Sequence, residues 1–255
     1  MIAALAAFTI SAPAMALNML WLDSDHSPYS GYYNYGQALT FTDGTVTVEV
    51  TGWSINDSDT INDARLGVWT YGLGVLNSDG DNSHTIDNSG WTDFVVLLFD
   101  QAVILSSAQF NTGWHDMNDT DATIGYDIVA LPFNVAGAID GQNASVLSSW
   151  NLYSSDSSGF GDEFRNINPG SNSGNLWLIG ASFDNPTECF QTSRGTKCKE
   201  KPDGFKLELV KYETAVPEPA TWAMMLLGFG LIGGVMRRRN GRNLKSANTP
   251  RLAHQ

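Results

Sequence analysis

Short runs of β-branched and aromatic residues, separated by turn sequences, are the feature that most constrains the fold of this chain. Residues 46–51 alternate apolar and polar side chains, which is typical of a strand with one buried face. Residues 94–99 are apolar without interruption, which predicts a strand buried on both faces. Further strands are expected at 103–109, 124–131, 176–181 and 205–210, and a short helix near 144–152.

Turn sequences such as Asp43-Gly44, Asp79-Gly80 and Asp140-Gly141 lie between these runs. Strands at this spacing predict an all-β fold, an antiparallel β-sandwich of jelly-roll type, over residues 17–214. Trp53 and Trp177 lie within expected strands, so we expect both in the core.

Charge is distributed unevenly along the 255 residues, whose formal net charge is −13. All 27 acidic residues lie between Asp23 and Glu218, whereas six of the 14 basic residues follow Met236. An acidic body argues against nucleic acid as a partner, because phosphates require a basic face. A basic end behind an acidic body indicates a membrane boundary between the two.

The N-terminus has the features of a secretory signal peptide over residues 1–16. An apolar stretch at 2–10 is followed by Ala14-Met15-Ala16, a small-x-small site, and we expect cleavage after Ala16. A buried N-terminal helix is the alternative.

The C-terminus combines three parts over residues 215–239. Val216-Pro217-Glu218-Pro219 comes first, and residues 220–236 carry no charge and predict a single transmembrane helix. Arg237, Arg238 and Arg239 follow as a basic stop-transfer cluster, and residues 240–255 form a polar basic tail.

These three parts, in this order, resemble the PEP-CTERM sorting signal. The resemblance implies that an exosortase, an integral membrane protein, cuts near Pro217–Pro219 in a Gram-negative bacterium that makes extracellular polysaccharide. It implies an inner-membrane precursor and a mature body outside the cell. Residues 84–126 also resemble a segment of such surface proteins, which implies a β-sandwich body and no known enzymatic activity. A permanent tail anchor is the alternative.

Two cysteines, Cys189 and Cys198, lie nine positions apart. Export into an oxidising compartment favours a disulfide between them. Two free thiols are the alternative.

Acidic clusters are candidates for calcium, which prefers several hard oxygen ligands. None matches an EF-hand, and solvated turns are the alternative for each. We favour the third cluster because it follows Gly113-Trp114 between two expected strands. The clusters are Asp57/Asp59/Asn62/Asp63, Asp79/Asp81/Asn82/Asp87 and Asp116/Asn118/Asp119/Asp121.

The chain has no recognisable catalytic motif, and we expect no enzymatic activity. Trp91 and Trp114 lie at the ends of expected strands, where an exposed ring could stack on a sugar of an extracellular polysaccharide. The sequence therefore predicts an exported, non-enzymatic surface or matrix protein. A calcium-dependent carbohydrate-binding module anchored at the cell surface is the alternative.

Overall fold

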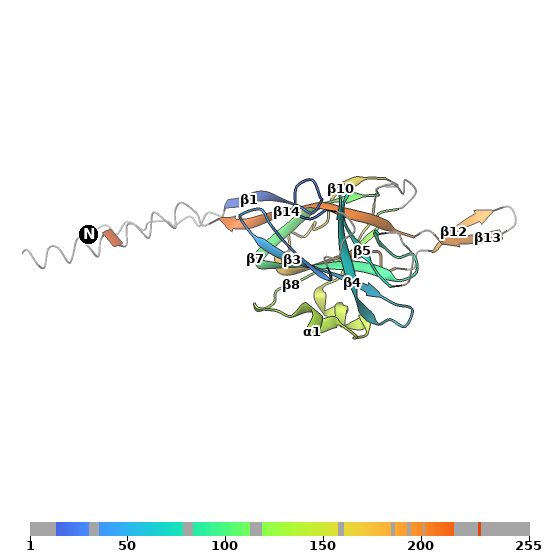
Figure 1. The fold of residues 1–255 in the computed structure, drawn as a ribbon. Coiled ribbons are helices and arrows are strands. Elements are labelled where there is room, and N and C mark those ends of the chain that lie inside the picture. Colours follow the sequence, from blue (N-terminus) through green and yellow to red (C-terminus); the bar gives the residue numbers. More distant parts are fainter. Residues whose placement is uncertain are drawn as a thin grey trace, which may run out of the picture. The chain divides into compact units, whose positions relative to one another are not determined.

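The computed structural model describes residues 14–30, 36–78, 84–112, 119–157, 161–184, 187–192, 195–200, 202–216 and 229–230. Residues Leu17–Thr214 form one compact unit, and Met1–Ala16 with Ala215–Gln255 are assigned to a second. Strands dominate the described residues, which confirms the all-β prediction (Figure 1).

Most strands belong to one twelve-stranded sheet, and β12 and β13 form a separate hairpin. The helical elements of the body are α1 (Val135–Ile139) and the 3-10 helix η1 (Ala144–Trp150), which confirms the expected short helix. The strands are β1 (Ala14–Trp21), β2 (Ala38–Thr42), β3 (Thr47–Ile55), β4 (Ile61–Trp69), β5 (Gly72–Leu76), β6 (Ile86–Asp87), β7 (Thr92–Asn111), β8 (Ala122–Asp127), β9 (Tyr153–Ser155), β10 (Glu163–Asn166), β11 (Gly174–Ala181), β12 (Thr187–Thr192), β13 (Gly195–Glu200) and β14 (Gly204–Val216).

The 20-residue strand β7 joins the two parts of the sheet. Its first half pairs with β3 and β11, and its second half pairs with β10 and β14. The pairings β7–β3, β3–β4, β4–β5, β5–β14 and β14–β7 then close a ring. The described strands thus form a barrel-like body, where the sequence predicted two separate sheets.

A short polar stretch within β7 explains why the sequence predicted two sheets instead of one continuous sheet. The sequence predicted separate strands at 94–99 and 103–109, but β7 runs through both. Asp100, Gln101 and Ala102 between them are exposed, at the point where the strand passes from one set of partners to the other. Polar residues there are compatible with a continuous strand because their side chains reach solvent.

The first half of β7 is buried on both faces, as predicted. Val95 and Leu97 belong to the inner hydrophobic cluster, together with Trp177 of β11. Phe94 and Val96 point to the opposite face and belong to an outer cluster, which includes Trp53 and is covered by side chains of α1 and η1. Trp53 and Trp177 are fully buried, which confirms their predicted place in the core.

The Asp43-Gly44 turn joins β2 to β3, as predicted. Gly44 has a φ of +88°, a conformation that favours glycine. The Asp43 carboxylate accepts hydrogen bonds from the backbone N–H groups of Thr45 and Val46, at 2.8 and 3.2 Å. The side chain therefore stabilises the bend that sets the register of the hairpin.

The predictions for the two ends of the chain fall mostly outside the described residues. This holds for residues 1–13 of the expected signal peptide, for Pro217–Pro219 and for Arg237–Arg239. Strand β1 begins at Ala14 and so runs across the expected cleavage position after Ala16. In the part of the chain that is described, no helix has the length and apolar character needed to cross a membrane.

The two cysteines lie in the β12–β13 hairpin, where the backbone register places Cys189 directly opposite Cys198. Cross-strand partners have Cα atoms about 4.5–5.5 Å apart. A disulfide needs a Cα separation of about 4.4–6.8 Å, so the backbone register is compatible with the predicted bond. The side chains themselves are outside the description, and the disulfide stays a prediction.

Adjacent leucines of β7 provide a test of the two-face burial. We expect Leu97→Ala to lower the free energy of unfolding by about 2–5 kcal/mol, because Leu97 is fully buried in the inner cluster. Leu98→Ala should cost about 1 kcal/mol, because Leu98 is only partly buried. Urea unfolding of the two variants measures the difference, and equal losses would contradict the assigned faces.

Candidate metal centre

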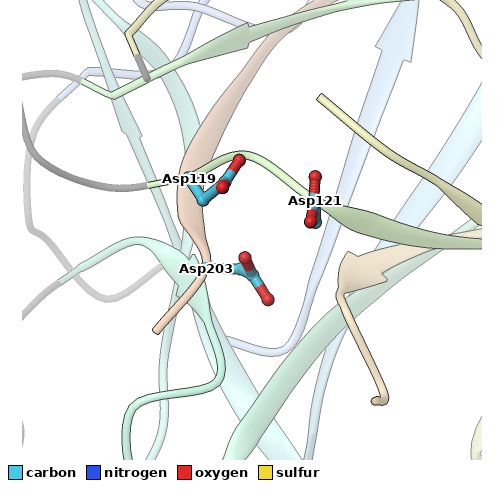
Figure 2. A group of neighbouring side chains, drawn as sticks. All are labelled: Asp119, Asp121 and Asp203. Carbon is cyan, nitrogen blue, oxygen red and sulfur yellow. The ribbon is translucent and has the colours of Figure 1, made fainter. Parts of the chain in front are cut away.

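Three carboxylates converge at one end of the body (Figure 2). Asp119 and Asp121 precede β8, and Asp203 precedes β14, more than 80 residues later in the chain. One carboxylate oxygen from each residue lies within 4.8 Å of the others. Asp203 is only 6% exposed, and the other two residues are half-buried. Within the described residues, this is the one such group close enough to share an ion.

Backbone hydrogen bonds hold the two segments together. Asp119 and Asp203 form a parallel β-bridge, and the N–H of Gly204 donates to the Asp119 carbonyl at 2.9 Å. The N–H of Ser182, just after β11, donates to the Asp121 carbonyl at 3.1 Å. The positions of the three aspartates therefore follow from the ends of β8, β11 and β14.

Asn88 orients Asp203. Its side-chain Nδ2 donates to the Asp203 carboxylate at 2.8 Å and to the Ser182 carbonyl at 3.0 Å. Its Oδ1 accepts from the backbone N–H of Asp203 at 2.7 Å. Because Asn88 is itself buried, this pair of contacts fixes the carboxylate in one orientation.

Ser157 links the other two aspartates. Its backbone N–H donates to Asp121 Oδ1 at 2.6 Å, and its hydroxyl donates to the Asp119 carboxylate. Asp119 Oδ1 also accepts from the N–H of Thr120 at 2.9 Å. These donors offset part of the negative charge that the three carboxylates bring together.

Arg165 of β10 supplies positive charge close to Asp119 and Asp121. Its guanidinium donates to Thr120 Oγ1 at 2.9 Å, to the Ser155 carbonyl at 2.8 Å and to Glu163 at 3.0 Å. Burial lowers the pKa of Arg165, whereas Glu163, Asp121 and Asp119 act in the opposite direction. The arginine supports the segment that carries two of the aspartates and reduces the net negative charge near them.

The donor set fits a hard divalent cation. Carboxylate oxygens are the ligands that Ca²⁺ and Mg²⁺ prefer, and three of them converge on a small volume here. Like charges at this separation repel, and a bound cation would relieve that repulsion. Ca²⁺ accepts six to eight ligands in flexible geometry, which suits a site built from two segments better than the strict octahedron of Mg²⁺.

The predicted calcium ligands are only partly brought together. Asp119 and Asp121 lie in the centre, and Asp116 and Asn118 fall outside the described residues. Asp203 was missed because it lies far along the chain from the acidic cluster. An Asp-Gly pair before an expected strand was its one local signal, and that pattern is typical of any turn.

The other two acidic clusters are divided between turns and strands. Asp57 and Asp59 lie in the turn between β3 and β4, whereas Asn62 and Asp63 belong to β4 and Asp87 belongs to β6; Asp79, Asp81 and Asn82 fall outside the described residues. Beside the first cluster, the side chain of Asn56 accepts hydrogen bonds from the N–H groups of Ser58 and Thr60, at 2.9 and 3.0 Å. In the second, the Asp87 carboxylate accepts from the Thr85 hydroxyl at 2.6 Å and from the Ser89 N–H at 3.0 Å. These contacts are those of side chains that stabilise bends.

The predicted sugar-stacking pair, Trp91 and Trp114, stays a prediction. Trp91 is half-buried immediately before β7, and Trp114 falls outside the description.

A buried lysine lies on β14, three residues after Asp203. The Nζ of Lys206 lies 3.8 Å from the centroid of the Trp69 ring and donates to the His84 carbonyl. Burial lowers the pKa of Lys206 to about 7, although the neighbouring carboxylate of Asp87 acts to raise it. Burial is the larger effect because the side chain is only slightly exposed.

This lowered pKa predicts a stability that depends on pH. Between about pH 7 and 10 the unfolded chain binds a proton at Lys206 that the folded chain does not, so stability should rise with pH. The slope from one such group is at most about 1.4 kcal/mol per pH unit. Urea unfolding across this range should show a flatter curve for Lys206→Met than for the unaltered protein. Parallel curves would contradict the shift.

The described residues form an all-β body, and the sequence that follows it resembles a sorting signal. Comparison with protein-family models matches residues 215–240 to the PEP-CTERM protein-sorting motif. Residues 215–240 therefore carry the PEP-CTERM sorting motif, as the resemblance predicted. The motif implies export, a membrane-anchored precursor and processing by an exosortase. No curated protein and no solved structure matches the chain.

Proposed function

We propose that this chain is a non-enzymatic surface or matrix protein of an exopolysaccharide-producing Gram-negative bacterium, delivered to the exterior by exosortase processing. The match of residues 215–240 to the sorting motif carries the proposal. In this proposal the uncharged segment 220–236 is the transmembrane helix of the precursor, and Arg237–Arg239 stay on the cytoplasmic side.

The arrangement of the first and last strands supports this processing. β1 and β14 are neighbours in the sheet, and the Leu22 N–H donates to the Glu208 carbonyl at 2.8 Å. Cleavage after Ala16 would leave Leu17–Trp21 of β1 in place, and cleavage after Val216 would leave β14 whole. Both cuts therefore spare the compact unit Leu17–Thr214.

The intact mass of the protein from its exporting host tests the proposal. We expect a chain that ends near Pro217–Pro219 in a host with the exosortase, and a longer chain when the exosortase is deleted. Replacement of Pro217, Glu218 and Pro219 by alanine should give the longer chain in both hosts. An unaltered protein that retains residues 222–255 in both hosts would instead establish a permanent tail anchor.

A calcium-dependent carbohydrate-binding module is the second candidate, favoured by the convergence of Asp119, Asp121 and Asp203. Bound Ca²⁺ would supply positive charge and link the segment before β8 to the start of β14. Asp116 and Asn118 precede Asp119 in the same predicted cluster and would supply further oxygen ligands. Trp91 and Trp114 are the sugar-stacking residues that the sequence predicts for this candidate.

Thermal unfolding with and without calcium tests the centre. Ca²⁺ at about 100 times its dissociation constant should stabilise the protein by about 2.7 kcal/mol relative to EDTA. Asp203→Asn should lose most of this response, because it removes one of the converging charges while keeping the shape of the side chain.

Asp140→Asn is the matched control, because Asp140 is an exposed acidic residue in a turn outside all three candidate clusters. It should respond to calcium as the unaltered protein does. A calcium response of equal size in Asp203→Asn, or none in the unaltered protein, would exclude this metal centre.

A further inference from the structure

An open groove of about 330 Å³ lies on the outer face of β2, β3 and β7. Its floor is a row of side chains across the three strands, since Thr40 pairs with Glu49 and Glu49 pairs with Leu98. Thr47 and Asp100 also line the groove, each two residues along its strand and thus on the same face. Both carboxylates and both hydroxyl groups are on exposed residues.

One wall of the groove is apolar and comes from the loop that precedes α1. Leu131, Pro132 and Phe133 line it. They end a run of six consecutive apolar residues, 128–133, in which Ile128 is 68% exposed and Leu131 is 45% exposed. Val129 and Phe133 of this run pack partly against the outer hydrophobic cluster, whereas the exposed Ile128 and Leu131 are typical of a surface that contacts a ligand or partner.

We propose that this groove binds an uncharged sugar ring of a polysaccharide. The carboxylates of Glu49 and Asp100 would accept hydrogen bonds from sugar hydroxyls, and these bonds are stronger than those between neutral groups. The apolar wall with the Phe133 ring would pack against the C–H face of the sugar. A volume of about 330 Å³ is at the lower end for ligand sites, which suits one or two sugar rings.

The charge of the groove selects against anionic ligands. Its described lining holds two carboxylates and no lysine or arginine. A phosphate, a sulfate or the carboxylate of a uronic acid would therefore meet like charge without a basic partner. Among sugars, a neutral polyhydroxylated ring therefore fits the groove better than an anionic one. The inference deepens the carbohydrate-binding candidate and rests on it, but it uses residues that are not in the metal centre.

Affinity electrophoresis of the full-length chain in detergent tests the inference. Gels that contain dextran, mannan or a soluble β-glucan supply uncharged sugars, and gels with alginate supply a polyuronate. We expect retardation by at least one neutral polymer and none by alginate. Glu49→Gln, Asp100→Asn and Phe133→Ala should each raise the dissociation constant roughly tenfold, as expected for a lost hydrogen bond to a charged group or a lost ring contact.

Asp140→Asn again serves as the control and should bind as the unaltered protein does. Glu49 and Asp100 are exposed, so Glu49→Gln and Asp100→Asn should melt near the unaltered temperature. Phe133→Ala should melt lower, because Phe133 also packs against the outer hydrophobic cluster, so its binding is compared below its own melting temperature. The inference would be overturned if no neutral polymer retards the protein, if the variants bind as well as the control, or if alginate binds equally. Exosortase is not involved in the measurement, so failure here is distinct from a failure of sorting.

Discussion

The body depends on a single constraint, the burial of β7 on two faces along a strand of 20 residues. One face of its first half fills the interior of the ring, and the other requires a covering layer, which side chains of α1 and η1 provide. Its second half pairs with β10 and β14, so the last strand of the chain closes onto the middle of the sequence. The groove floor includes Leu98 and Asp100 of the same strand.

Several strands were predictable from local pattern, whereas others, such as β2, β4 and β5, were not predicted, and neither were the pairing partners. The runs at 46–51, 94–99, 176–181 and 205–210 all lie in or overlap observed strands, because alternation and continuous apolarity report directly on burial. Ring closure requires β14 to pair with both β5 and β7, and no local pattern specifies such distant pairings. The continuity of β7 through Asp100 was not predicted either, because an exposed polar stretch within a strand has the same composition as a turn.

The same division between local and distant information applies to the sites. Asp119 and Asp121 were identified because acidic residues gather there in the sequence. Asp203 and Asn88 belong to the centre only through the meeting of β8, β11 and β14. The groove was missed entirely, since threonine and glutamate on the outer face of a strand have the pattern of a solvated surface. The register of three strands places these side chains in one row, and the loop that follows β8 forms a wall beside them, so the site is concave.

Strand β14 separates the proposed metal centre from the sorting signal. Asp203 directly precedes its first residue, and Val216, the first residue of the Val-Pro-Glu-Pro sequence, is its last. Thirteen residues of extended chain span about 40 Å, which is greater than the reach of direct contacts or of screened charge interactions between the two ends. Processing near Val216 therefore does not depend on which residues lie near Asp203. Under the proposed function, such a body can change its ligand specificity while the sorting segment stays the same.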